Sequence, residues 1–274
     1  ADDHSAETGD EEIDEDDLVK GDAEESDDPA DSSAEEASSK NASRSSKAKS
    51  SASTKNDKQY LDGVPEEFIG PLLMEVVMHE VGHTLGLRHN FKGSTIYTLA
   101  EVNDDSFTGA SSGSVMDYLP ININYELGDA QGPWTLMTLG PYDYWAIEYG
   151  YTASKPEKVL ARATDPLLVY ATDEDTWGPD PRARRFDNGA NPLNYCDSQI
   201  GLAKHLRAQI LEEMVEDGES WAEARKAYDM LLNKQLGAVN VAANWIGGSY
   251  VNRYKKGDEG DYDPIAPIEA DQQR

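Results

Sequence analysis

Three of the five histidines in this chain lie within one eleven-residue stretch that runs from His79 to His89. His79 and His83 are four residues apart, so on a helix they share one face and both imidazoles can reach a single ion. Glu80 follows His79 directly and can reach a water on that ion without being a ligand. The spacing therefore predicts a zinc site in which Glu80 is a general base.

A third ligand is needed, because catalytic zinc takes three protein ligands and keeps a fourth position for water. His89 is the candidate, although a helix continuing straight would carry it away from the metal. Gly86 lies between His83 and His89, and glycine readily adopts the left-handed conformation that ends many helices. We therefore predict that the chain turns at Gly86 and brings His89 back, an extended pattern far more specific than His-Glu-x-x-His alone.

The helix that carries this motif is expected to begin near Pro71, since proline fits a first turn better than a helix interior. Pro65-Glu66-Glu67 also resembles a helix start, with acidic side chains near the positive end of the helix dipole. Residues 91–113 are rich in Gly, Ser, Asn and Asp and predict an irregular loop, followed by a turn at residues 114–120.

Further along the chain, hydrophobic spacing and helix-boundary residues predict helices separated by an irregular stretch. Proline at its start and glycine at its end favour a short helix over residues 141–150. Residues 156–192 are rich in Pro and Asp and are expected to be mostly irregular. Helices are predicted over residues 197–216 and over most of 219–250.

Charge is distributed unevenly over the 274 residues, whose formal net charge is −29. Residues 1–39 hold eighteen Asp or Glu, and residues 40–58 are rich in Ser, Ala and Lys. Residues 1–59 carry too few large apolar side chains to offset chain entropy and are predicted to be disordered. This acidic head is interpreted as a solubilising spacer, or alternatively as a segment that binds cations or a basic partner.

Several classes of function are disfavoured by composition. A strongly acidic chain argues against nucleic-acid binding, which needs clustered Lys and Arg. No segment is long and apolar enough for a membrane span. Cys196, the single cysteine, excludes an internal disulfide and is interpreted as a partly buried thiol. The chain shows no signal peptide and does not start with Met, so we expect a processed form or a fragment.

The extended histidine motif followed by a methionine resembles the signature of the metzincin metallopeptidases. Met116 lies 27 residues after His89, in Ser-Val-Met-Asp-Tyr, and the resemblance implies a turn that supports the zinc site as a hydrophobic base. In some metzincins a tyrosine two residues after that Met stabilises the oxyanion. Tyr118 holds this position, and an oxyanion role and a buried structural role stay equally open.

The wider sequence is most similar to the bacterial Met-zincin family of zinc-dependent metalloproteases. The similarity covers roughly residues 60–274 and is carried by four further segments, namely 68–75, 142–150, 170–175 and 247–253. It implies an α+β metzincin-like core that is helix-rich in this chain, with a mostly helical C-terminal region. We divide the chain into the head (1–59), the catalytic core (60–152) and a family-specific region (153–274).

In metzincins a mixed sheet precedes the zinc helix and pairs with extended substrate. Residues 1–59 cannot form that sheet, so another piece of the protein is expected to supply it, or the head is an insertion between sheet and helix. The resemblance and the residues together predict a zinc-dependent endopeptidase acting on protein or peptide substrates. The alternatives are a zinc-loaded module that does not cleave and, more weakly, hydrolysis of a non-peptide amide. An extracellular, periplasmic or cell-surface location is expected, and the sequence leaves the oligomeric state open.

Overall fold

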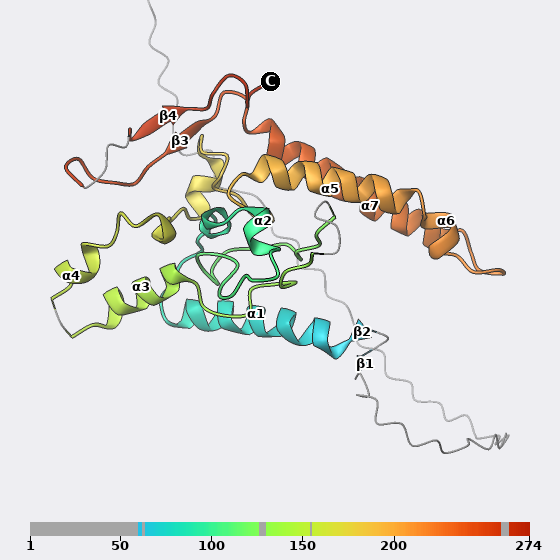
Figure 1. The fold of residues 1–274 in the computed structure, drawn as a ribbon, viewed down its shortest axis with the longest axis horizontal. Helices are drawn as coiled ribbons and strands as arrows, with labels where there is room; N and C mark the ends of the chain where they lie inside the picture. Colours follow the sequence, from blue (N-terminus) through green and yellow to red (C-terminus); the bar gives the residue numbers. More distant parts are fainter. Residues whose placement is uncertain (1–59, 62–63, 126–129, 154, 259–262) are drawn as a thin grey trace, which may run out of the picture. The chain divides into compact units, whose positions relative to one another are not determined.

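The computed structural model describes residues 60–61, 64–125, 130–153, 155–258 and 263–274 (Figure 1). The chain separates into two units, Ala1–Thr54 and Lys55–Arg274. The predicted disordered acidic head falls almost wholly in the first unit and lies outside the described residues. The boundaries proposed for the core and the C-terminal region stay predictions.

Helices dominate the described part of the chain, which confirms its helix-rich character. Its strands pair only as two short antiparallel ribbons, β1 (Tyr60–Leu61) with β2 (Val64–Pro65), and β3 (Ser249–Val251) with β4 (Ile265–Pro267). The α-helices are α1 (Glu66–Thr84), α2 (Leu99–Val102), α3 (Pro141–Tyr151), α4 (Glu157–Leu160), α5 (Pro192–Arg207), α6 (Ile210–Glu213) and α7 (Ala222–Ala243). The 3₁₀ helices are η2 (Gly93–Ile96), η3 (Pro166–Leu168) and η4 (Asp173–Trp177).

Helix α1 carries the histidine pair and starts earlier than expected. The prediction that it begins near Pro71 is wrong, because the helix begins at Glu66 and holds Pro71 inside it. The helix starts instead at the Pro65-Glu66-Glu67 signal. Glu66 and Glu67 occupy the first turn, where the helix dipole favours acidic side chains. The lost backbone hydrogen bond at Pro71 falls near this end and leaves the motif-bearing turns intact.

Two other predictions about local structure need correction. The segment 91–113 is not wholly irregular, because it contains η2 and α2. Thr98 and Glu101 form a capping box that fixes the start of α2, a signal overlooked among the many turn-forming residues. Helix α5 begins at Pro192 instead of residue 197, since the Asn191 side chain accepts a hydrogen bond from the Leu193 amide and caps it.

The core that positions the motif lies beneath the C-terminal half of α1. Val115, Met116 and Leu136 are buried together, and Met78 and Leu87 pack against them. Helices α5 and α7 form the most extensive helix pair of the described residues and run side by side (Figure 1). No helix of the described residues is both long and apolar enough to cross a membrane.

Candidate metal centre

The end of α1 turns the chain as the histidine spacing requires. Gly86 has a φ of +86°, in the left-handed region that glycine tolerates. The Leu87 amide donates to the Gly82 carbonyl at 3.0 Å, and the Gly86 amide donates to the His83 carbonyl at 3.0 Å. These two bonds form the Schellman arrangement that closes a helix. The predicted turn at Gly86 is therefore present, and it places His89 opposite α1.

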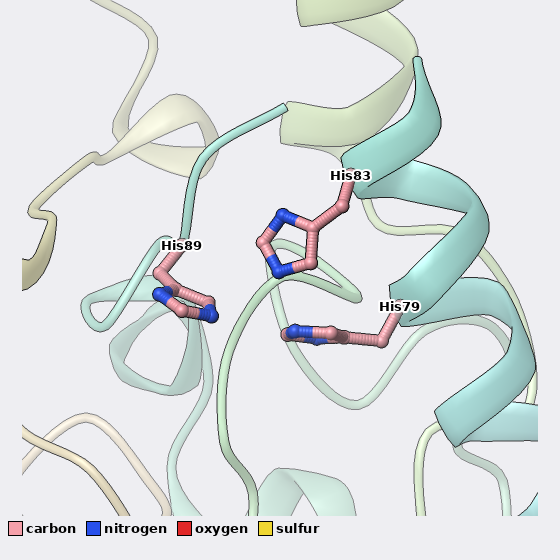
Figure 2. A group of neighbouring side chains, drawn as sticks. All are labelled: His79, His83 and His89. Atoms are coloured by element: carbon pink, nitrogen blue, oxygen red, sulfur yellow. The ribbon is translucent and has the colours of Figure 1, made fainter. Parts of the chain in front are cut away.

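The three histidines converge on one point, as Figure 2 shows. His79 and His83 project from α1, and His89 projects toward them from the segment that follows the turn. One ligand atom from each ring lies within 4.8 Å of the other two. In the described part of the chain, this is the one group of His, Cys, Asp or Glu with metal-binding spacing. The structure thus brings together the three residues that the sequence nominated.

Hydrogen bonds at the Nδ1 atoms orient these rings. His79 Nδ1 lies 2.7 Å from the Val115 carbonyl, and His83 Nδ1 lies 3.0 Å from the Leu87 carbonyl. A carbonyl only accepts, so both Nδ1 atoms carry a proton, and in the neutral ring Nε2 then keeps its lone pair. His89 Nδ1 is held in the same way by the Asp173 carboxylate, at 2.9 and 3.1 Å.

The Nε2 atoms fit a metal ion. Those of His79 and His89 are buried and have no hydrogen-bond partner, which is costly for a polar atom unless something else binds it. Burial also lowers the pKa of His79, although the Val115 carbonyl opposes this effect. A neutral imidazole is the form that binds zinc. Lone pairs on buried, unpartnered nitrogens are the donor set that a zinc ion requires.

Asp173 is a positioning residue that the sequence analysis missed. Its carboxylate binds His89 Nδ1 and also accepts a hydrogen bond from Arg185 Nη2 at 2.9 Å. A carboxylate behind a metal-bound histidine fixes the ring and makes it a better ligand. In the sequence, the segment 170–175 stands out only by its resemblance to the family. Because Asp173 is 84 residues from His89, the spacing of the two residues does not predict that they interact.

We predict that Asp173→Asn weakens zinc binding by about 10- to 100-fold, the usual effect of losing such a partner. The affinity can be measured by competition with a chromophoric chelator. Glu174→Gln is the matched control, because Glu174 is adjacent and exposed but pairs with Arg88 instead of a histidine. Equal zinc affinities for the two variants would show that Asp173 does not support His89.

Met116 lies directly under α1. It is fully buried, and a Cβ atom added at Gly82 would lie 2.3 Å from its sulfur. Only glycine at this position lets the helix approach so closely. Asp143 of α3 fixes the same turn, accepting from the Ser114 hydroxyl at 2.6 Å and the Val115 amide at 2.9 Å. The turn therefore lies under the His79 side of the three histidines. This is the position expected of a methionine turn that supports a zinc site.

Tyr118 and Glu80 lie at the same centre in different environments. The Tyr118 ring packs 5.2 Å from the His79 ring and 4.8 Å from the His89 ring, measured between centroids. Its hydroxyl makes no hydrogen bond to any described residue, so the oxyanion and structural roles both stay predictions. Glu80 is exposed, and its charge acts on His79, but it makes no hydrogen bond or ion pair among the described residues. Its carboxylate is therefore available for a water or a substrate.

Together, helix α1, its glycine turn and the three oriented imidazoles form a site that can hold a metal ion. Comparison with known families makes this more specific. The model of the Met-zincin family matches residues 62–274, most of the chain, and the protein belongs to that family. No curated protein and no solved structure matches the chain.

Proposed function

We propose that this protein is a zinc-dependent endopeptidase. The observation that carries the proposal is the convergence of three imidazoles whose Nδ1 atoms are all engaged, so that their Nε2 atoms face one another. A zinc ion held by His79, His83 and His89 would act as a Lewis acid and lower the pKa of its water to about 7. The finer α+β description of the core, with a substrate-binding sheet, belongs to the same proposal.

The chain's own residues perform the proton transfers in this proposal. Glu80 takes the proton from the attacking water and delivers it to the amine that leaves. Its exposed, unpartnered carboxylate supports this role, because a purely structural zinc site needs no such group. Tyr118 is proposed to stabilise the negative charge that develops on the carbonyl oxygen, supported by its ring packing against His79 and His89.

The second candidate is a zinc-loaded module that does not cleave. One observation favours it: α1 leaves apolar side chains in solvent, including Leu73, Val76 and Val77, the last with 60 % of its surface exposed. The metzincin resemblance would put a substrate-binding sheet beside the zinc helix, and within the described residues nothing covers these side chains. A chain without that sheet would bind metal and lack one wall of the cleft.

Hydrolysis of casein and of a mixed peptide library distinguishes the two candidates. We expect the zinc-loaded protein to produce new peptide termini, and we expect a chelator to abolish this activity. Added zinc should restore it, whereas magnesium should not, because imidazole ligands suit zinc and not magnesium. Full zinc occupancy without any cleavage would favour the module that does not cleave.

A further inference from the structure

A pocket of about 290 Å³ lies where α5 and α7 meet the chain that follows Met116. We call it the Lys234 pocket. Its walls are mostly apolar, and its polar lining includes Gln199 of α5, Lys234 of α7 and Arg185. Arg185 is already paired with the Asp173 carboxylate. The residues that the argument uses are Pro120, Phe186, Tyr195, Cys196, Gln199 and Lys234.

The pocket is one aromatic ring away from the histidines. The Phe186 ring stacks on the Tyr118 ring with centroids 5.8 Å apart, and Tyr118 in turn packs on His89. The Phe186 amide donates to the Tyr118 carbonyl at 2.8 Å, so the pocket wall is tied to the turn beside the metal. Adjacent residues of an extended peptide are about 3.3–3.6 Å apart. A substrate residue close to the cleaved bond can therefore place its side chain in the pocket.

Phe186 adopts a strained backbone conformation at this position. Its φ is 63°, and it is the one non-glycine residue with positive φ among the described residues. Such a conformation costs about 1–2 kcal/mol for a residue with a Cβ atom, so the surrounding structure must impose it. The strain holds an exposed aromatic ring between the pocket and Tyr118.

Two polar groups of the pocket have no partner within the described part of the chain. Lys234 is partly buried and makes no ion pair or hydrogen bond there, in a protein with far more acidic than basic residues. Burial lowers the pKa of Lys234, and no neighbouring carboxylate raises it. Only 3 % of the Gln199 surface is exposed, and its buried amide oxygen has no hydrogen-bond partner. An unpaired ammonium and an unpaired amide oxygen are costly unless a ligand supplies an acceptor for the first and a donor for the second.

We propose that the Lys234 pocket binds the carboxylate side chain of a substrate residue next to the cleaved bond, and so makes the enzyme selective for acidic peptides. Lys234 supplies the charge for the carboxylate, a backbone N–H of the peptide donates to the Gln199 oxygen, and Pro120 and Tyr195 contact the methylene groups. A glutamate fits this combination of apolar walls and a cationic end. This inference rests on the proposed peptidase function and deepens it.

The test measures binding separately from cleavage. Two short peptide hydroxamates, identical except for Glu or Gln at the residue beside the hydroxamate, are titrated calorimetrically into the zinc-loaded protein. We expect the Glu compound to bind about tenfold tighter or better, as is usual for a charged hydrogen bond. Lys234→Met should remove this difference, and Lys234→Glu should reverse it in favour of a Lys compound.

The matched control is Lys226→Met, because Lys226 lies on the same helix but is exposed and pairs with Glu223. It should leave the ratio of Glu to Gln affinity unchanged. A ratio near one in the natural protein, a ratio that Lys234→Met does not change, or no zinc-dependent binding of either compound would overturn the proposal. Cleavage of the corresponding amide peptides is scored separately, so selective binding without cleavage would overturn the peptidase function and leave the pocket's charge preference established.

Discussion

Glu80→Gln is expected to lower peptide hydrolysis by about 100- to 10,000-fold while zinc remains bound. The change removes the proton acceptor and keeps the shape of the side chain, and general acid–base catalysis commonly contributes a factor of this size. The ligands are untouched, because the metal centre is formed by His79, His83 and His89 and their Nδ1 partners. Turnover measured on a quenched fluorescent peptide, together with zinc content by atomic absorption, gives both quantities on the same sample.

Glu66→Gln provides the control for this experiment, because Glu66 lies on the same helix, in its first turn, far along the chain from the histidines. Removing its charge costs at most about 1 kcal/mol of helix stability and should leave turnover intact. A Glu80→Gln variant that hydrolyses peptides as fast as the Glu66→Gln variant would remove Glu80 from the proposed mechanism. Loss of zinc in the same variant would instead assign Glu80 a role in holding the metal.

Raising the pH should weaken the fold through a buried pair of carboxyl groups behind the methionine turn. Asp117 accepts from the Ser94 amide at 2.8 Å, and Asp187 lies near enough for its charge to affect Asp117. Burial raises the pKa of Asp187 to about 8, and burial together with the charge of Asp187 raises that of Asp117. The Glu75 carboxyl is shifted in the same direction by burial, its pKa rising to about 7.

The sign of the effect follows from proton binding. In the folded state each of these carboxyl groups keeps its proton up to its raised pKa, about 7 for Glu75 and about 8 for Asp187, whereas in the unfolded chain it has lost the proton above about pH 4. Stability then falls as pH rises, by up to about 1.4 kcal/mol per pH unit for each group, and levels off above the folded pKa. We expect urea unfolding of the zinc-loaded protein between pH 6.5 and 8.5 to show this decline. Asp187→Asn should flatten it.

Asp197→Asn is the control for that measurement, since Asp197 is an exposed acidic residue on α5. It should leave the slope of stability against pH unchanged. An Asp187→Asn protein that loses stability with pH as steeply as the Asp197→Asn protein would show that Asp187 is ionised in the folded state. A saturating concentration of zinc at every pH keeps the metal centre occupied, so that metal loss does not imitate the carboxyl effect.

The ligands of the metal centre could be predicted because local geometry determines where most of them lie. His79 and His83 are one helical turn apart whatever surrounds them, and Gly86 ends the helix for a conformational reason that acts within a few residues. The helix over residues 141–150 was predicted for similar reasons, and α3 runs from Pro141 to Tyr151. Structure that depends only on residues within one helical turn can be predicted without knowing the rest of the fold.

Features that depend on distant parts of the chain could not be predicted. Asp173 supports His89 from 84 residues away, and Asp143 fixes the methionine turn from 28 residues away. Each carboxylate resembles many others in a sequence with 53 acidic residues, so composition gives no reason to prefer it. The start of α1 was hard to predict for a different reason, because two local signals conflict: Pro71 favours a first turn, whereas Glu66 and Glu67 form the actual one.

The contact between Gly82 and Met116 has a consequence for resistance to oxidants. The Met116 sulfur is fully buried against α1, so an oxidant cannot reach it from solvent unless the structure opens locally. Met137 and Met230 are at least half exposed, so peroxide reaches their sulfurs first. Mild oxidation should therefore convert Met137 and Met230 to sulfoxides before Met116, so that these exposed side chains consume the oxidant first.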